Sequence, residues 1–436
     1  MVLSIPDSDP YWLLNAQVPH CFLDEDQWRP RTAENLVLVD VQIAAGTIAQ
    51  IMPAGTGDIQ GQPGVDLRQG QVWPCFVDLH THLDKGHIWN RAPNPDGTFT
   101  SALATVQQDA RFWQPEDLYH RMVFGLKCSY AHGTQAIRTH LDCGQGLAEV
   151  SLDVFQELQQ QWADRLTLQA VCLVPLDYFL TPAGEKLADR IADLGGVLGG
   201  LPLMGPDLDR QLERVFALAR ERNLGLDFHV DESNNPQDRT LRAVADVALR
   251  HPIAGEIVCG HACSLAVQPP VEAAATIARV GEAGIGIVSL PLCNLFLQDR
   301  QLGRTPRWRG VTMLQELKAG GVPVALASDN CRDPFYGFGD HDLLEVFTRS
   351  VQIAHLDQPY GDWPHAITRT PAELMGLPDL GRIRVGLAAD LILFQARYFS
   401  ELLSRPQADR VVLRRGRPID TTLPDYAELD PWVIPR

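Results

Sequence analysis

The middle of the chain alternates between short apolar runs and segments with helical spacing, and this alternation restricts the fold more than any other feature of the sequence. Eight such runs occur in order, namely CFVDLH, QAIRTH, LQAVCLVP, GVLGGLP, LGLDFHV, EIVCGH, IGIVSLP and VALASD. The segments between them, such as DLDRQLERVFALARERN, carry apolar residues at helical intervals. Nearly continuous apolar strands that alternate with helices are typical of a parallel sheet that helices cover.

Eight strand–helix units over about 270 residues predict the α/β class and a closed (β/α)8 TIM barrel. An open doubly wound sheet is the alternative, but it would more often carry a glycine-rich phosphate-binding turn after its first strand, and this sequence has none there. Both ends of the chain show short alternating apolar runs, such as LVLVDVQI and RVVLRRGRPID. We therefore predict a small β-sandwich domain formed by residues 1–72 and 383–436, and a catalytic barrel domain over residues 73–382.

Composition narrows the possible partners and the compartment. The 436 residues carry a formal net charge of −17, which disfavours binding to the phosphates of nucleic acids. No apolar stretch is long enough for a membrane span, and the beginning MVLSIPDSDPYW does not resemble a signal peptide. The nine cysteines are odd in number and form no CxxC pair, which favours free thiols in a reducing compartment. We expect a cytoplasmic enzyme that binds neither nucleic acid nor a membrane.

Ionisable residues lie at the carboxyl ends of the predicted strands, where barrel enzymes have their active sites. The first run ends in the sequence HTH, and residues two apart in a strand point the same way, so His80 and His82 can reach one ion. The fifth run contains His229, the sixth ends in His261 and the eighth ends in Asp329. An HxH pair can occur by chance and a single strand-end histidine can be structural. Several such positions on one rim favour a shared site.

Two imidazoles from one strand, a third from another and a carboxylate suit a borderline divalent ion such as Zn²⁺ or Fe²⁺. Such a site leaves a position open for water, whose pKa the ion lowers toward neutrality. Asp329 can hold the ion and accept the proton of this water. Glu232, three residues after His229, is placed to carry a proton to a leaving nitrogen. His261 can donate a hydrogen bond to the attacking oxygen.

Other catalytic patterns are missing or weak. The sequence contains no HExxH motif, no GxSxG elbow, no P-loop and no PCxxC deaminase pattern. Cys259 and Cys263 flank His261, but their spacing is not typical of a thiolate metal site, so we interpret them as core thiols. Lys85 follows the HTHLD stretch, where it either lines the pocket or is an ordinary solvated lysine.

The segments HTHLDK, HVDE, GHACSL and ASDNCRDPF together resemble the amidohydrolase superfamily, and within it the cytosine deaminase branch. The stretch ASDNCRD is also similar to relatives that hydrolyse s-triazines, such as the N-isopropylammelide amidohydrolases. The resemblance covers roughly residues 70–390 and the terminal strands. It implies one metal ion, whose ligands are His80, His82, His229 and Asp329. It also implies that Glu232 is the proton shuttle and that His261 orients the water. Two-metal relatives use a carboxylated lysine on a middle strand, and LQAVCLVPLDYF has no lysine.

The sequence departs from cytosine deaminase at the positions that would contact the substrate. The glutamine that follows the proline of the third strand in that branch is Leu176 here, the carboxylate after the metal-binding aspartate is Asn330, and the stacking tryptophan is Phe335. The substrate contacts that we expect are Leu83, Leu176, Asn330 and Phe335. Because leucine cannot hydrogen-bond an amide-like edge, this pocket disfavours cytosine itself. Asp177 or Tyr178 are candidates to replace part of that recognition.

The resulting expectation is metal-dependent hydrolytic deamination of an amino-substituted nitrogen heterocycle, such as a cytosine-like pyrimidine, with release of ammonia. A pterin or triazine deaminase is the alternative. A second hypothesis is hydrolysis of a cyclic amide or an N-alkylamino heterocycle, and a third is a barrel that only binds its ligand. By analogy with similar barrels we expect a homo-oligomer.

Overall fold

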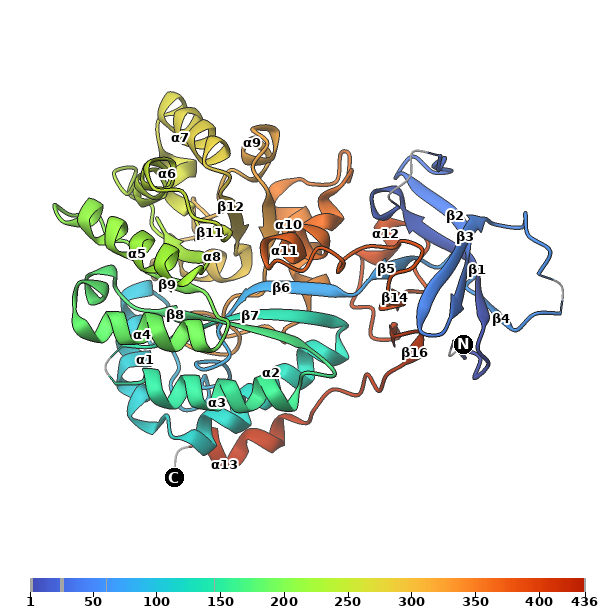
Figure 1. Ribbon diagram of the computed structural model, residues 1–436, viewed down its shortest axis with the longest axis horizontal. Coiled ribbons are helices and arrows are strands. Elements are labelled where there is room, and N and C mark those ends of the chain that lie inside the picture. Colours follow the sequence, from blue (N-terminus) through green and yellow to red (C-terminus); the bar gives the residue numbers. More distant parts are fainter. Residues whose placement is uncertain (1–2, 24–26, 60, 145, 435–436) are drawn as a thin grey trace.

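The computed structural model describes residues 3–23, 27–59, 61–144 and 146–434. Figure 1 shows a large helix-covered body and a smaller strand-rich body beside it. The strands are β1 (Tyr11–Pro19), β2 (Leu36–Ala44), β3 (Thr47–Pro53), β4 (Gly64–Asp66), β5 (Val72–Pro74), β6 (Phe76–Thr81), β7 (Thr134–Asp142), β8 (Thr167–Leu173), β9 (Leu198–Gly200), β10 (Leu226–Val230), β11 (Ile257–His261), β12 (Gly286–Ser289), β13 (Val324–Leu326), β14 (Leu391–Leu393), β15 (Val411–Arg414) and β16 (Arg417–Pro418). The helices are α1 (Phe99–Asp109), α2 (Pro115–Ala131), α3 (Ala148–Gln161), α4 (Pro182–Asp193), α5 (Leu208–Arg222), α6 (Thr240–Arg250), α7 (Pro270–Glu282), α8 (Pro291–Leu297), α9 (Leu314–Ala319), α10 (Leu343–Ala354), α11 (Arg369–Leu374), α12 (Phe399–Leu402) and α13 (Asp430–Val433).

The large body contains two parallel sheets that the helices surround. One has the order β6-β7-β8 and the other the order β13-β12-β11-β10-β9. Parallel bridges between Val171 and Val197, and between Thr81 and Asp329, join the two sheets at both edges. Each of the eight predicted apolar runs forms one of these strands, in the predicted order. The mixed α/β class with parallel strands is therefore confirmed.

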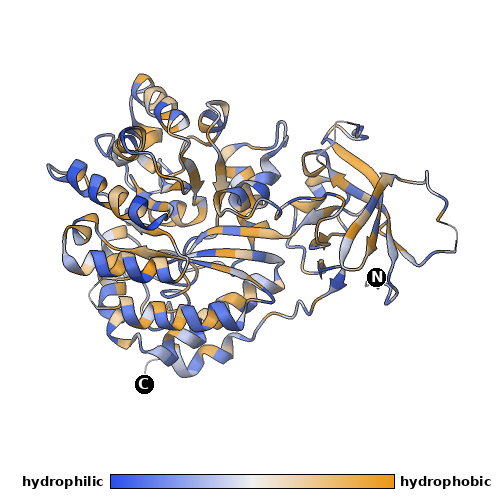
Figure 2. Cartoon of the chain, viewed as in Figure 1, coloured by the Kyte–Doolittle hydropathy of each residue, from blue (hydrophilic) through white to orange (hydrophobic). Residues whose placement is uncertain are grey.

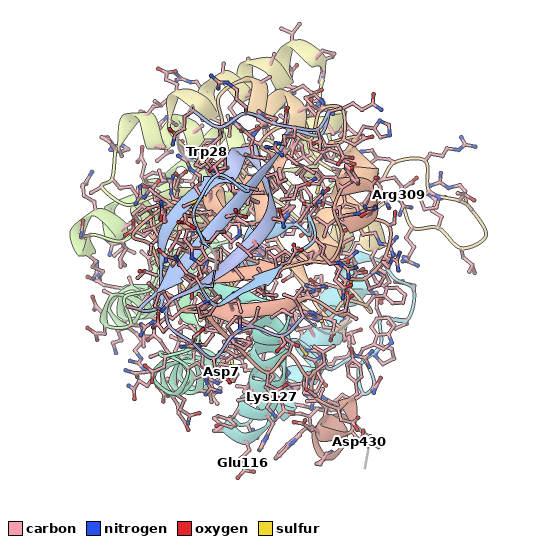
Figure 3. The ribbon with its side chains drawn as sticks, turned by 90° about the vertical axis from the view of Figure 1, so that its right-hand side faces the viewer. Asp7, Trp28, Glu116, Lys127, Arg309 and Asp430 are labelled. Carbon is pink, nitrogen blue, oxygen red and sulfur yellow. The ribbon has the colours of Figure 1, made fainter. Side chains whose placement is uncertain are left out.

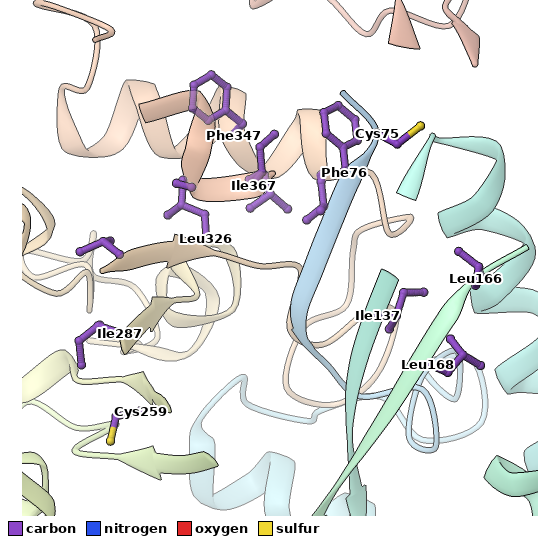
Figure 4. Packing of buried hydrophobic residues seen from close by; sticks show 14 of the residues in the cluster. Cys75, Phe76, Ile137, Leu166, Leu168, Cys259, Ile287, Leu326, Phe347 and Ile367 are labelled. Carbon is purple, nitrogen blue, oxygen red and sulfur yellow. The ribbon is translucent and has the colours of Figure 1, made fainter. Parts of the chain in front are cut away.

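Apolar side chains fill the space between these strands and their helices. Figure 4 shows Phe76 of β6 and Leu326 of β13 in the same cluster as Phe347 of α10, and all three side chains are buried. A second cluster joins strand residues such as Val258 to Leu374 at the end of α11. Figure 2 shows that the helices alternate between hydrophobic and hydrophilic residues along their length, as the helical spacing in the sequence predicts.

Segments from both ends of the chain form the smaller body. One four-stranded sheet has the order β3-β2-β1-β4, and another has the order β16-β15-β14-β5. In the second sheet Trp73 of β5 pairs with Ile392 of β14, so strands from before and after the large body share one sheet. A bridge between Gln17 and Gln71 links the two sheets. Figure 3 looks onto this body, with its strands in front of the helices.

The last described residues lie against the large body. After β16 the chain runs back to α2 (Figure 1), where Leu429 and Val433 form a buried cluster with Phe124 and Cys128. The predicted small domain extends over residues 383–436. The part of this range that follows β16 packs instead on an apolar face of α2, in the large body.

The structure also bears on the state of the cysteines and on possible membrane spans. All nine cysteines are free thiols, as predicted. Among the described residues, no helix combines the length and the apolar character needed to cross a bilayer.

Candidate metal centre and substrate cavity

The ends of β6 and β13 bring two histidines and an aspartate together. The backbone N–H of Asp329 donates to the carbonyl of His80 at 2.9 Å, and the Thr81 hydroxyl donates to the carbonyl of Asp329 at 2.9 Å. This pairing places Asp329 Oδ1 at 3.7 Å from His80 Nε2 and at 3.4 Å from His82 Nε2. Asp329 has a φ of +61°, a backbone conformation that non-glycine residues rarely adopt and that is often found at functional sites.

Neighbouring strands supply the other predicted groups. His229 of β10 places its Nε2 at 3.3 Å from His82 Nε2. His261, at the end of β11, has its ring centroid 5.0 Å from that of His229. Glu232 Oε1 lies 3.4 Å from His261 Nδ1. The structure thus brings the proposed ligands and both proposed catalytic side chains into one cluster.

The protonation states of this cluster suit a cation. Burial lowers the pKa of His80, His82 and His229 well below the ordinary histidine value, so the rings are neutral and their contacts with Asp329 are not ion pairs. Burial raises the pKa of Asp329 to about 8. Both carboxylate oxygens of Asp329 and both ring nitrogens of His80 are buried without a hydrogen-bond partner. Unpaired buried polar atoms are costly, so a divalent ion fits this donor set.

One further contact prepares His82 for a metal. Its Nδ1 lies 3.2 Å from the backbone carbonyl of His140, so Nδ1 carries the proton and Nε2 keeps a free lone pair. His140, at the end of β7, also packs its ring against His80, with 3.9 Å between the ring centroids. His140 is not among the residues predicted from the sequence, although the run QAIRTH ends in histidine, as CFVDLH and EIVCGH do.

Asn294 on α8 contacts both side chains for which we predict catalytic roles, Glu232 and His261. Its Nδ2 donates to Glu232 Oε1 at 3.1 Å and to His261 Nδ1 at 3.1 Å. Because His261 Nδ1 accepts this bond, the ring proton of His261 is on Nε2, which has no other partner. Burial, and then the nearby Asp329, raise the pKa of Glu232 well above its usual value. Sequence reasoning missed Asn294 because it lies on a helix and not at a strand end.

A cavity of about 620 Å³ opens above the cluster. The residues at its base are His82, His229, Glu232, His261 and Asp329. Its walls are mainly apolar and include Phe99, Leu103 and Val106 of α1. Two of the expected substrate contacts, Asn330 and Phe335, also line it.

The other two expected contacts lie elsewhere among the described residues. Leu83 is not part of the cavity lining, because its side chain packs against α2 at Gly125. Leu176 is buried beside Gly200, where it supports the wall from behind. The segment after β8 instead presents Asp177 and Tyr178 to the cavity. Leu176 therefore does not contact the cavity.

Lys85 lines the cavity as a buried cation, which decides between the two interpretations of this residue. Burial alone would lower its pKa, but Asp142 and Asp84 outweigh burial and raise it. Its Nζ donates to Asp142 Oδ1 at 2.8 Å and lies 5.4 Å from the centroid of the Phe335 ring. The cavity thus combines a flat aromatic wall with one fixed positive charge.

The chain belongs to the amidohydrolase family, whose model matches residues 152–420. As in that family, it is a hydrolase that acts on C–N bonds. The chain is 49% identical to a pterin deaminase of Rhizobium rhizogenes over 98% of both chains. It is 22% identical to the N-isopropylammelide isopropyl amidohydrolase of a Pseudomonas species, over 82% of this chain and 87% of that one.

Solved structures share the fold. The 5-methylcytosine deaminase of Klebsiella pneumoniae superposes with a TM-score of 0.80 at 23% identity, over 95% of this chain and 98% of that one. The N-isopropylammelide isopropylaminohydrolase of Burkholderia multivorans gives a TM-score of 0.73 at 21% identity, over 94% and 98% of the two chains. The predicted resemblance to the amidohydrolase superfamily is confirmed.

Proposed function

We propose that this enzyme deaminates pterin, a bicyclic heterocycle that carries an amino and an oxo group on its pyrimidine ring. The observation that carries the proposal is the 49% identity with a pterin deaminase over 98% of both chains. The predicted reaction class, hydrolytic deamination of an amino-substituted nitrogen heterocycle, is confirmed by these relatives. Among the predicted substrates, the proposal favours the pterin alternative over a cytosine-like pyrimidine.

The cavity supports a substrate larger than one pyrimidine ring. Its volume of about 620 Å³ lies in the middle of the range for pockets that bury drug-sized ligands. Phe335 and the apolar residues of α1 offer surfaces on which a flat bicycle can pack. No glutamine stands at position 176 to read the polar edge of a single pyrimidine.

We propose that His80, His82, His229 and Asp329 hold one divalent ion, Zn²⁺ or Fe²⁺. The unpartnered buried oxygens of Asp329 and the neutral rings around them support this. Such an ion would lower the pKa of a water molecule and so supply a nucleophile near neutral pH.

The surrounding side chains then move the protons. Burial raises the pKa of Glu232, which favours its protonated form, and from that form Glu232 can donate to a ring nitrogen next to the carbon that is attacked. Asp329 can take one proton from the water. Glu232, which the first donation leaves as a carboxylate, can take the remaining proton of the attacking oxygen and pass it to the leaving amino group, so that ammonia departs as the C–N bond breaks. Return of the proton from Asp329 to Glu232 restores the starting state. The Nε2–H of His261 can donate to the oxygen on the same carbon.

We assign recognition of the oxo group to Lys85. Asp142 occupies one of its three N–H donors, and the others can reach a carbonyl on a ring stacked against Phe335. A cationic donor favours a carbonyl oxygen over an amino group at the same position, because the amino group cannot accept the bond.

The test is ammonia release from a substrate panel that contains pterin, cytosine, isocytosine, 5-methylcytosine and an aminotriazine. We expect the highest kcat/KM for pterin. Ammonia from cytosine but not from pterin would return the assignment to a pyrimidine. Isopropylamine from N-isopropylammelide, without ammonia from any member of the panel, would favour the second hypothesis.

Several broader predictions remain proposals. We propose that the eight parallel strands form a closed (β/α)8 barrel, which the bridges at both sheet edges support. We also propose that the terminal sheets form a small sandwich and that the domain limits are near residues 72 and 383. A cytoplasmic location is supported by the nine free thiols, and a homo-oligomer rests on analogy alone.

A further inference from the structure

A second group of metal-ligating side chains lies beyond the substrate cavity. It consists of His87, Cys331 and His341, which we call the second cluster. All three are buried, with exposed fractions of 3%, 1% and 3%. None of them is among the described residues that line the cavity. We propose that the second cluster binds a further transition-metal ion, such as Zn²⁺, which joins two loops of the active site.

The geometry of the second cluster matches that of a metal site. His87 Nε2 and His341 Nε2 lie 3.2 Å apart. Two nitrogen ligands at about 2.0–2.1 Å from one tetrahedral ion are separated by about 3.3 Å. His82 Nε2 and His229 Nε2, which we assign to the first ion, are 3.3 Å apart. One ligand atom from each of the three side chains lies within 4.8 Å of the others.

The donor types select the class of ion. Burial lowers the pKa of His87 well below its usual value and lowers that of His341 to about 4, so both rings are neutral and keep a lone pair. Burial raises the pKa of Cys331 well above its ordinary value, so the residue is a thiol without an ion, and an ion bound here would displace its proton. Two imidazoles and a thiolate suit Zn²⁺, Co²⁺ or copper, and do not suit Mg²⁺ or Ca²⁺.

Without an ion, the second cluster is poorly satisfied. Two neutral rings can form only one hydrogen bond between their Nε2 atoms, with a single proton. This hydrogen bond is the simplest alternative to a bound metal ion. The backbone is also unusual, because His87 and His341 have φ values of +66° and +56°. Such conformations cost of order 1–3 kcal/mol each and persist only where the surroundings enforce them.

An ion at this place would connect the two loops that border the cavity. His87 lies between β6 and α1, while Cys331 and His341 lie between β13 and α10. The loops already meet where the backbone N–H of His87 donates to the carbonyl of Cys331 at 3.0 Å. The second of these loops also carries Asn330 and Phe335 of the cavity wall. The site is buried and offers three protein ligands, so a tetrahedral ion there would take a water molecule as its fourth ligand.

The experiment is metal analysis of the full-length protein, purified after growth with Zn²⁺, together with absorption spectra after exchange to Co²⁺. We expect two metal equivalents per chain in the wild type and one in Cys331→Ser and His341→Ala. The Co²⁺ protein should show a thiolate-to-cobalt charge-transfer band that Cys331→Ser abolishes. Cys293→Ser is the matched control, because Cys293 lies beside the first site, with its sulfur 3.5 Å from Asn330 Oδ1, and should leave the band intact.

The outcomes separate the alternatives. One equivalent and no thiolate band in the wild type would overturn the proposal and leave a hydrogen-bonded histidine pair. One equivalent with a band that depends on Cys331 would support the second cluster and count against the first site. The wild-type measurements do not depend on whether a variant folds. Two equivalents in a protein that releases no ammonia would refute the proposed function and leave this inference standing.

Discussion

The cluster of His80, His82, His229 and Asp329, here the first cluster, and the second cluster both draw on the same two stretches of chain but differ in their access to the cavity. Residues 80–87 and 329–341 contribute side chains to both. The first cluster opens onto a cavity of about 620 Å³ and includes the carboxylate of Asp329. The second cluster is closed and includes a thiol. Catalytic metal sites keep one position open for water or substrate.

The same two loops can therefore contribute to catalysis through the first cluster and to stability through the second cluster. Arg121 of α2 fixes the short link between the clusters, since its guanidinium donates to the carbonyls of Asp84 and Gly86. The side chain of Arg121 is fully buried. Arg121, which belongs to neither cluster, therefore helps to hold the backbone between His82 and His87 in place.

The largest expected effect is complete loss of turnover on chelation. An ion in the open cluster should be removed first, because only that cluster borders the cavity. Activity should disappear while about one equivalent of Co²⁺ and its thiolate band remain, and should return with added Zn²⁺. Rapid metal analysis alongside ammonia release checks this. Equal rates of loss for both equivalents would remove the distinction between an open and a closed site.

Glu232→Gln is expected to lower kcat by about 10²–10⁴-fold, the usual contribution of a general acid–base group. Glutamine keeps the size and the bond from Asn294 but cannot carry the proton. Metal content should stay at the wild-type value. Glu256→Gln is the matched control, since Glu256 is exposed just before β11 and is not among the described residues that line the cavity. Wild-type turnover in Glu232→Gln would reject the assigned proton transfer.

The sequence alone predicted the strands and the ionisable side chains that gather at their carboxyl ends, because both follow from local rules. Apolar runs mark strands that are buried on both sides, and the carboxyl end of a strand marks the active-site rim. The same rule should have included His140, which ends the second run. Asn294 could not be found in this way, because only the packing of α8 brings it to Glu232 and His261.

The second cluster and the cavity wall show a different limit. His87 and His341 are 254 positions apart, and neither belongs to a strand, so no spacing in the sequence relates them. Position 176 was expected to contact the substrate from its place after a proline. The turn there directs Leu176 into the core and presents Asp177 and Tyr178, which a one-dimensional pattern does not determine.

Asn294→Leu should reduce kcat by about 10–100-fold, in the range found when a partner that orients an active-site histidine is lost. Without the bond from Asn294, His261 can move its proton to Nδ1 and lose its donor toward the cavity. KM and the melting temperature should change little. Gln298→Leu is the control from the next turn of chain, since the side chain of Gln298 donates to the backbone carbonyl of Glu232, at 3.3 Å, and not to its carboxyl group. A rise in KM in both Asn294→Leu and Gln298→Leu would instead indicate that the cavity wall is disturbed.

Lys85→Met should lower kcat/KM for pterin by about 10-fold, because a hydrogen bond to a charged group contributes about 1.5–3 kcal/mol. The effect should appear mainly in KM. The diamino analogue of pterin, in which the oxo group is replaced, should lose much less. Equal losses of kcat/KM for both compounds would show that Lys85 supports the cavity wall through its bond to Asp142 and does not bind the oxo group of the substrate.

The smallest effect on turnover is expected for Asp117→Asn, which weakens the support of the link between the clusters. Asp117 Oδ2 accepts from Arg121 Nη2 at 2.7 Å, and Oδ1 accepts from Arg91 Nη1 at 2.5 Å, while Asp109 also binds Arg91. Loss of one partner of such a buried pair costs about 3 kcal/mol of unfolding free energy. We expect a lower melting temperature at neutral pH and a kcat close to that of the wild type.

The pH dependence of this difference in melting temperature follows from the direction in which the pKa of Asp117 is shifted. Burial would raise the pKa of Asp117, but Arg121 and Arg91 outweigh it and lower the pKa below the ordinary value. The stabilisation is therefore fully present above the unfolded pKa of about 3.9 and is lost as the pH falls through the folded pKa. Melting curves of both proteins between neutral and acidic pH should converge only below about pH 4. A constant difference down to lower pH would mean that the asparagine acts through shape and not through lost charge.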